Sequence, residues 1–241
     1  MLKQFLPFMI ALFVFSSATA QKNNSAVSFY KAGIELKNKN KFSEATASFN
    51  KATALNKQFD SAYIQLGEIN MKIGDFDKAI NNFKKAIAIN PEMPMANIAL
   101  GNIYRDAKPN YDSALLCYFT ALKKDDKNKI TYYSIAWCYN AKGEYENAIT
   151  NAIKALYIDN TYKAAYSELG HAYHKAKKYS EAIAQFKKNL SVSIVDMPIF
   201  YSGLCYIELK DKEGAMQQYV ELKKINEKLA ESLKRSIDKM Q

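Results

Sequence analysis

His171 and His174 are the only histidines of the chain, and with Glu168 they form a group whose residue types suit a metal ion. Spacings of three residues place the three side chains on one face of a helix. A helix that exposes polar residues at this spacing is common, and no further histidine exists to complete a tetrahedral set. We therefore expect no metal here and assign both histidines to hydrogen bonding with a bound peptide.

Residues that could catalyse a reaction do not form a recognisable group. No glycine-rich phosphate loop follows a strand pattern, no nucleophile lies in a recognisable elbow, and the carboxylates are scattered over polar helix faces. The sequence therefore predicts a protein that is not an enzyme and that uses no cofactor. Metal binding and an enzymatic accessory role are the remote alternatives.

The helices that must carry these residues repeat along the chain. Small residues recur in two series, both at steps of 33 to 35 residues. The first series is Gly33, Gly67, Gly101, Ala136, Gly170 and Gly203, and the second is Ala45, Ala79, Ala114, Ala148, Ala182 and Ala215. A fixed period in both series indicates one supersecondary unit copied in tandem.

The copy over residues 60–91 shows the pattern most clearly. One helical face is formed by Tyr63, Leu66, Gly67 and Asn70, and a second by Phe76, Ala79, Phe83 and Ala86. Gly74 breaks the helix between the two faces, and Pro91 ends the unit because proline cannot continue a helix. Each unit is thus a helical hairpin. A single hairpin cannot bury its apolar stripe, so neighbouring hairpins must stack.

This pattern resembles the tetratricopeptide repeat family over about residues 26–225. The Leu-Gly pair of the family appears as Leu66-Gly67, Leu100-Gly101 and Leu169-Gly170. The resemblance implies an all-α fold: a right-handed α-solenoid of six hairpins, with a C-terminal helix that caps the last one. The expected division is a signal peptide (1–20), a short linker (21–25), repeats at 26–59, 60–93, 94–128, 129–162, 163–195 and 196–225, and the capping helix (226–241).

Two repeats depart from the regular length. One extra residue lies between Gly101 and Ala114, which predicts a longer turn in the third hairpin. One residue is missing between Ala182 and Gly203, and Asn189 replaces an expected alanine. We expect the junction of the fifth and sixth repeats to be bent or loose.

The resemblance also implies where a partner would bind. First-helix residues that do not face the neighbouring helix line the concave groove of such arrays, and the only tryptophan and both histidines fall there. Aromatic and amphipathic side chains offer much contact area at low entropic cost. We therefore expect the groove to bind a protein, as an extended peptide or a partner helix. The predicted contact residues are Tyr133, Trp137, Asn140, His171, His174, Phe200 and Leu204.

The first twenty residues have the composition of an export signal. Lys3 precedes an apolar run from Phe5 to Phe15, and Ala18-Thr19-Ala20 supplies the small residues of a cleavage site. We expect an exported protein, most simply in a bacterial periplasm. Secretion, or anchoring by an uncleaved segment, is the alternative.

Charge and cysteine content complete the expectations. The formal net charge is +10, which allows weak attraction to an anionic membrane or envelope surface, while the export signal argues against nucleic acid. The three cysteines are too few for a disulfide framework, and core packing is expected for Cys138 and Cys205. A scaffold that binds a protein partner is thus the main hypothesis. A self-associating structural component of an envelope assembly, forming a homo-oligomer, is the alternative.

Overall fold

The protein is described from a computed structural model, which covers residues 21–190 and 195–240. Every regular element in these ranges is helical, which confirms the predicted all-α class for this part of the chain. The predicted signal peptide (1–20) and the centre of the junction between the fifth and sixth repeats (191–194) lie outside the described residues. The chain divides into two compact units, one ending at Lys108 and the other beginning at Pro109, and each is described by itself.

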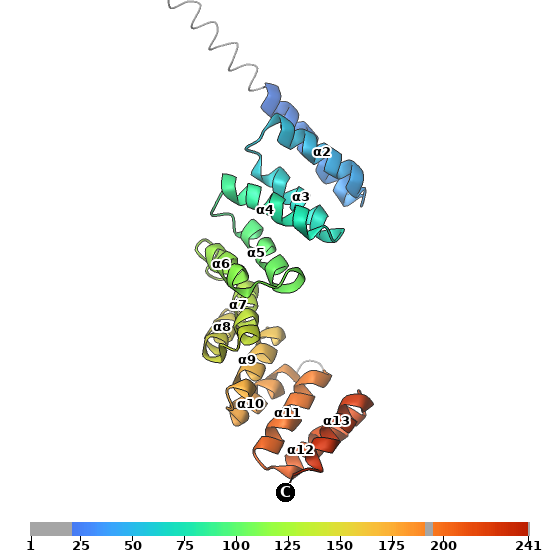
Figure 1. Ribbon diagram of the computed structural model, residues 1–241, viewed down its shortest axis with the longest axis vertical. Coiled ribbons are helices and arrows are strands. Elements are labelled where there is room, and N and C mark those ends of the chain that lie inside the picture. The colour runs from blue at the N-terminus through green and yellow to red at the C-terminus, as the bar shows by residue number, and fades with distance from the viewer. Residues whose placement is uncertain (1–20, 191–194, 241) are drawn as a thin grey trace, which may run out of the picture. The chain divides into compact units, whose positions relative to one another are not determined.

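Six helical segments lie among the described residues of the first unit, and their order can be followed in Figure 1. They are the helix over residues 21–38, α2 (Phe42–Leu55), α3 (Asp60–Lys72), α4 (Phe76–Ile89), α5 (Pro94–Asn102) and the π-helical turn η1 (Ile103–Ala107). Residues 21–25, expected as a linker, are helical and continue into the first helix. The start of α4 is fixed by Asp75, whose side chain accepts a hydrogen bond from the Lys78 N–H.

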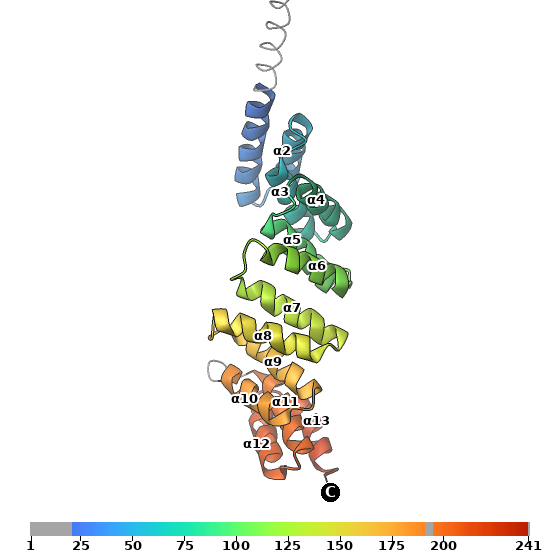
Figure 2. The same ribbon diagram turned by 90° about the vertical axis from the view of Figure 1, so that its left-hand side faces the viewer.

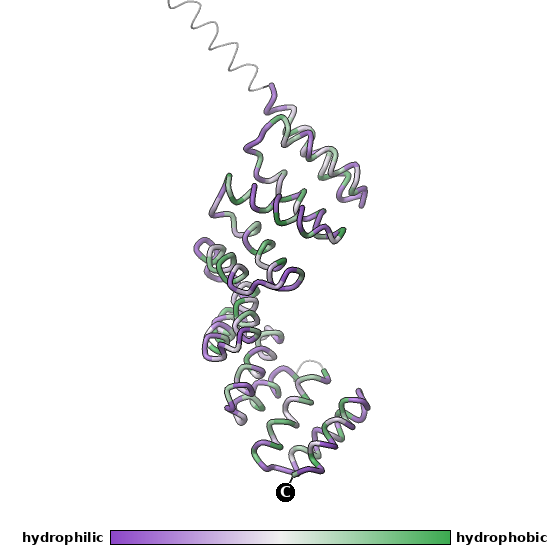
Figure 3. The backbone as a smooth tube through the Cα atoms, viewed as in Figure 1, coloured by the Kyte–Doolittle hydropathy of each residue, from purple (hydrophilic) through white to green (hydrophobic). Residues whose placement is uncertain are grey.

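Eight helices lie among the described residues of the second unit. They are α6 (Tyr111–Leu122), α7 (Lys129–Lys142), α8 (Tyr145–Ile158), α9 (Lys163–Lys175), α10 (Tyr179–Leu190), α11 (Asp196–Glu208), α12 (Lys212–Lys223) and α13 (Glu227–Ile237). From α7 to α13, each helix packs on the next along the chain, and Figure 2 shows this order from a second side. Hydrophobic and hydrophilic stretches follow one another along the helices that Figure 3 shows clearly, as expected where a helix buries one stripe.

The hairpin cores depend on a small residue of one helix facing a large residue of the next. In three hairpins the pair is a glycine and a phenylalanine 16 residues later, and a Cβ on that glycine would lie only 2.5 to 2.7 Å from the ring. The pairs are Gly33 with Phe49, Gly67 with Phe83 and Gly170 with Phe186. In the α7–α8 hairpin both positions are alanine, Ala136 and Ala152, and both are fully buried. The extra methyl group on the first helix is thus matched by a smaller side chain on the second.

The extra residue after Gly101 does not lengthen the turn as expected. Three residues separate η1 from α6, the same number that separates α3 from α4. The additional residue is instead absorbed by the π-helical turn of η1, where the Lys108 N–H donates to the Ile103 carbonyl five residues earlier. The prediction of a longer turn is therefore wrong.

Asn189 has a structural role that explains why it replaces the expected alanine. Its side chain is buried, and its Nδ2 donates to the Lys163 carbonyl and to the Ser167 Oγ, both at 2.9 Å. These bonds join the end of α10 to the first two turns of α9. The fifth hairpin is therefore closed by an amide at this position, where an alanine would close it by apolar contact alone.

The last helix covers the sixth hairpin. A Cβ on Gly203 of α11 would lie 2.5 Å from Leu233 of α13, so the capping helix here supplies the large side chain. Leu233 and Ile237 are fully buried against Ile199 and Leu222. The Asn226 side chain starts α13 by accepting from the Leu229 N–H and ties it to α11 by donating to Asp196 at 2.7 Å. The predicted capping helix is thus present, and it shares one core with α11 and α12.

Lysines of the second helices cover aromatic rings of the first helices. In four hairpins, a lysine Nζ lies 5.3 to 5.6 Å from the centre of a ring 22 residues earlier. The pairs are Lys51 with Phe29, Lys85 with Tyr63, Lys154 with Tyr132 and Lys188 with Tyr166. Cation–π contacts of this kind stabilise exposed sites by about 0.5 to 1 kcal/mol each. Part of the positive charge therefore has a packing role.

The three cysteines are all buried and form no disulfide. Cys138 and Cys205 are fully buried, which confirms that they act as small core residues. Burial, with a smaller contribution from the charge of Glu208, raises the pKa of the Cys205 thiol to about 12. This thiol is therefore protonated at neutral pH.

Candidate functional site

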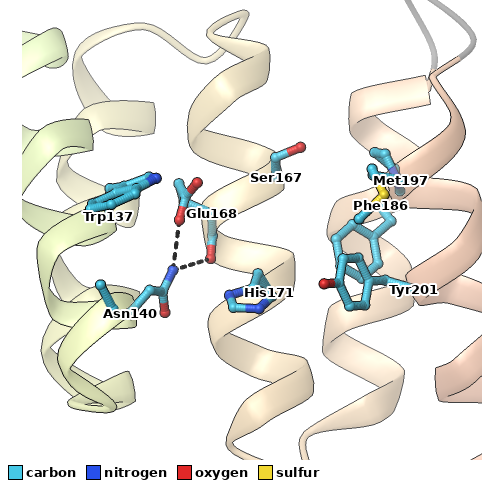
Figure 4. A pocket seen from close by; sticks show the side chains of 10 residues that line it. Trp137, Asn140, Ser167, Glu168, His171, Phe186, Met197 and Tyr201 are labelled. Carbon is cyan, nitrogen blue, oxygen red and sulfur yellow. Dashed lines mark hydrogen bonds between the residues drawn. The ribbon is translucent and has the colours of Figure 1, made fainter. Parts of the chain in front are cut away.

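A cavity of about 310 Å³ opens in the second unit, lined by residues of α7, α9, α10 and α11. Figure 4 shows Trp137 and Asn140 on one side, Phe186, Met197 and Tyr201 on the other, and α9 between them. The lining comprises Trp137, Asn140, Ala141, Ser167, Glu168, His171, Phe186, Met197, Pro198 and Tyr201. Most of these side chains are apolar or aromatic, and the polar groups other than the Tyr201 hydroxyl come from α7 and α9. This composition is typical of a binding pocket.

Asn140 joins α7 to α9 at the edge of the cavity. Its Nδ2 donates to the Glu168 carbonyl at 3.1 Å and to the Glu168 Oε2 at 2.8 Å, and the side chain is 8% exposed. Both bonds are drawn in Figure 4. In the first unit, Lys37 donates to Gln65 across the same 28-residue spacing. The bond between Asn140 and Glu168 thus belongs to a contact that links one first helix to the next.

Trp137 forms one wall of the cavity and is held from behind. The edge of its ring meets the Tyr111 ring of α6, with 5.8 Å between centroids and an interplanar angle of 72°. The side chain remains half-buried, so part of the indole surface faces the cavity. A large aromatic group that packs on a neighbouring ring and also lines the cavity is suited to contact a ligand.

The opposite wall is built around Tyr201 of α11. Its ring stacks on Phe186 of α10 at 6.1 Å and meets the His171 ring at 5.5 Å. Met197, 44% exposed, lies one turn before Tyr201 on the same helix. This wall is rigid where Phe186 supports it and adaptable at the methionine.

The two histidines lie in different surroundings. His171 lines the cavity. His174 lies one turn farther along α9, and its Nδ1 is 3.3 Å from the Cys205 Sγ. Burial lowers the pKa of both rings, and the charge of Lys175 adds to the effect. Both side chains are therefore neutral near pH 7.

The group of His171, His174 and Glu168 does not converge on one point. Glu168 points to Asn140, and the rings of both histidines lie against Tyr201. No cluster of three metal-binding side chains occurs among the described residues. The sequence spacing alone therefore overstated how closely these three side chains approach one another.

The structure places three of the seven predicted contact residues together in the cavity: Trp137, Asn140 and His171. Tyr133 meets the Tyr162 ring at 5.6 Å, outside the lining. Phe200 and Leu204 pack against the core that α11 forms with α12 and α13. With His174, these residues are not part of the cavity.

Sequence reasoning missed the wall formed by Tyr201, Met197 and Pro198. Tyr201 occupies the position in its repeat that Glu168 occupies in the preceding one, two residues before the small residue. That position could have identified Tyr201 once the bond between Asn140 and Glu168 was known. Phe186 packs in the hairpin core and also lines the cavity.

Acid is expected to weaken folding through the two histidines. Their pKa values in the folded chain lie below the ordinary value of 6.5, so between those values the unfolded chain binds more protons than the folded chain. Their contribution to the free energy of unfolding is thus complete above about pH 6.5 and is lost as the pH falls. Urea titrations at pH 7.5 and 5.5 should show a lower midpoint at pH 5.5.

The matched variant for this test is the double substitution His171→Gln, His174→Gln. It keeps every carboxylate, so any difference in the pH response belongs to the histidines. We expect a clearly smaller shift of the urea midpoint in the variant. Equal shifts in both proteins would contradict the assignment.

Comparisons with known proteins agree with the hairpin architecture. Family models for the tetratricopeptide repeat match residues 61–93, 131–162 and 164–193. No curated protein matches the sequence. In the described part of the chain, no helix has the length and apolar character needed to cross a membrane.

Solved structures share the fold at low sequence identity. A structure described as PilW, a widely conserved type IV pilus biogenesis factor, has a TM-score of 0.71 and 18% identity, covering 88% of this chain and 99% of its own. The PilF protein of Pseudomonas aeruginosa has a TM-score of 0.71 and 12% identity, covering 89% and 99%. A structure described as YrrB, a protein of the same repeat family with an unusual peptide-binding site, has a TM-score of 0.70 and 19% identity, covering 78% and 97%. At these identities the likeness concerns the fold.

Proposed function

Because the chain is a tetratricopeptide repeat protein, we propose that it is an exported scaffold that binds a peptide segment or helix of a partner protein in the cavity between α7, α9 and α11. The observation that carries this proposal is the cavity itself. It brings the only tryptophan together with Asn140 and His171 on consecutive first helices. Proteins of this family are generally scaffolds without catalytic activity.

The chemistry of the lining supports a peptide ligand. Trp137 and Tyr201 offer aromatic surface, Met197 can adapt its shape, and Asn140 and Glu168 offer hydrogen-bonding groups beside them. A peptide needs both kinds of contact, since its side chains are mixed and its backbone is polar. The peptide-binding site named for the YrrB structure is consistent with this use of the fold.

Export rests on separate support. The first twenty residues have the pattern of a cleavable leader, and one structural neighbour, PilW, is described as a type IV pilus biogenesis factor. We therefore place the protein in the envelope of a bacterium, most simply in the periplasm. Cell fractionation of a tagged chain, with N-terminal sequencing, tests this; an intact Met1 in the cytoplasm would contradict it.

Trp137→Ala is expected to weaken partner binding by about 2 kcal/mol, or roughly 30-fold in Kd. The substitution removes the largest contact surface of the cavity and leaves the helices in place. The measurement is affinity capture from envelope extracts, followed by titration of the captured protein.

The matched control is Tyr157→Ala. Tyr157 lies on α8, is 91% exposed and does not line the cavity, so its loss should leave binding unchanged. Equal binding by Trp137→Ala and the unchanged protein would contradict the proposal. A loss seen only with Tyr157→Ala would move the interface to α8.

A further inference from the structure

We infer that the cavity receives an arginine side chain of the partner segment, with its guanidinium between Glu168, Asn140 and the face of Trp137. This inference rests on the proposed function and specifies the ligand chemistry of the same site. It follows from the kinds of polar atom that the cavity offers, from their charge and from the walls around them.

The first step concerns Asn140. Its Nδ2 is engaged with Glu168, so this amide has little donor capacity left for a ligand. Its Oδ1 is buried and has no hydrogen-bond partner among the described residues. A buried acceptor without a partner is costly, and this oxygen has almost no accessible surface, so a ligand's donor removes the cost only when the amide turns toward the cavity. The corner of the cavity at Asn140 therefore favours a donor.

The second step concerns charge. Glu168 brings a carboxylate to the same corner, and a carboxylate accepts hydrogen bonds most strongly from charged donors. His171 adds no positive charge near pH 7, because burial lowers the pKa of its ring. These groups together favour a cation with several donors over a neutral or acidic side chain.

The third step distinguishes arginine from lysine. The guanidinium is planar, stacks on aromatic rings and is more weakly hydrated than an ammonium group, so it enters a mostly apolar cavity at lower cost. Trp137 offers such a ring beside Glu168, and Met197 and Tyr201 offer apolar surface for the aliphatic stem (Figure 4). The volume of about 310 Å³ is at the small end for ligand pockets and suits one large side chain better than a folded segment.

The charge of the whole protein limits the partner further. A formal net charge of +10 repels a strongly basic segment at long range. The partner is therefore expected to present one anchoring arginine among neutral or acidic residues, and a basic tract is disfavoured.

The test uses the fact that Trp137 is the only tryptophan, so one indole N–H resonance reports on the cavity alone. Three pools of random octapeptides differ only at one fixed central residue, which is arginine, citrulline or leucine. Citrulline keeps the shape of arginine and removes the charge. We expect the arginine pool to shift the Trp137 resonance at a concentration about tenfold or more below that of either other pool.

Two variants assign the effect to the carboxylate. Glu168→Gln removes the charge and can still accept the Asn140 bond, so folding should be kept and the difference between arginine and citrulline should disappear. Glu231→Gln removes the same charge from an exposed position on α13 and should keep the difference. A preference for arginine that persists in Glu168→Gln would overturn the inference.

The remaining outcomes separate the inference from the proposed function. If the leucine or citrulline pool moves the resonance as strongly as the arginine pool, the inference is wrong and peptide binding stands. If no pool moves the resonance, the inference is wrong, and the capture experiment with Trp137→Ala decides the proposed function.

Discussion

Gly170→Ala is expected to destabilise the protein by about 1 to 3 kcal/mol, although alanine is the better helix former. The new Cβ would lie 2.5 Å from the Phe186 ring, closer than two carbon atoms that are not bonded to each other can approach. The ring has little room to move, because it is almost fully buried and stacks on Tyr201. Overpacking therefore outweighs the gain of about 1 kcal/mol in helix propensity.

The same substitution should change sign when Phe186 is absent. Phe186→Ala alone is expected to cost about 3 to 5 kcal/mol, since it empties a buried aromatic site. In that background Gly170→Ala should stabilise by about 1 kcal/mol, because the methyl group meets no ring and the helix gains propensity. The α7–α8 hairpin already carries this alanine pair, Ala136 with Ala152.

A double-mutant cycle measures this coupling. Urea unfolding followed by circular dichroism gives the free energy of unfolding of the protein, both single variants and the double variant. Costs that simply add would contradict the structure at this contact. If the two costs add, the Phe186 ring must move aside to admit the methyl group. The presence of a glycine at position 170 would then need another explanation.

This contact shows how much of the fold the sequence could predict. The series of small residues and the aromatic 16 residues later place Gly170 and Phe186 in one hairpin, and the structure brings them together as the repeat pattern requires. A helical period determines which residues share a face, so hairpin contacts follow from spacing alone. The alanine pair of the α7–α8 hairpin could be predicted from the spacing in the same way.

The π-helical turn of η1 could not be predicted in this manner. An extra residue between two helices can enter the loop or widen one helical turn, and both choices keep the flanking helices in register. The structure places it at Ile103–Ala107. Spacing shows that a residue is added and leaves its location open.

The candidate site, too, could be predicted only in part. Trp137, Asn140 and His171 were identified because they occupy positions that each first helix, taken by itself, presents to the groove. Tyr201 and Met197 belong to the hairpin after the missing residue, where the chain passes residues outside the described ranges. How far α11 approaches α9 depends on how neighbouring hairpins pack. The repeat period of the sequence does not reveal this distance. The opposite wall of the cavity therefore needed the structure.

Leu233→Ala is expected to destabilise the protein by about 2 to 5 kcal/mol, the usual cost of emptying a fully buried leucine site. Leu233 belongs to the capping helix, is fully buried and lies over Gly203, where it supplies the bulk that a phenylalanine supplies in other hairpins. Lys228→Ala on the same helix is the matched control, because Lys228 is exposed and surface substitutions change stability by less than about 0.5 kcal/mol.

The position of Leu233 gives this prediction a second readout. In a repeat array each hairpin is stabilised mainly by its neighbours, so a loosened cap should expose α11 and α12 to hydrogen exchange before α7 and α8. Tyr201 and Met197 are carried by α11, and binding at the cavity should therefore weaken although Leu233 does not line it. Exchange that rises equally in all helices of the second unit would show that this unit unfolds as one body. In that case α13 would stabilise the cavity wall only through the stability of the whole unit.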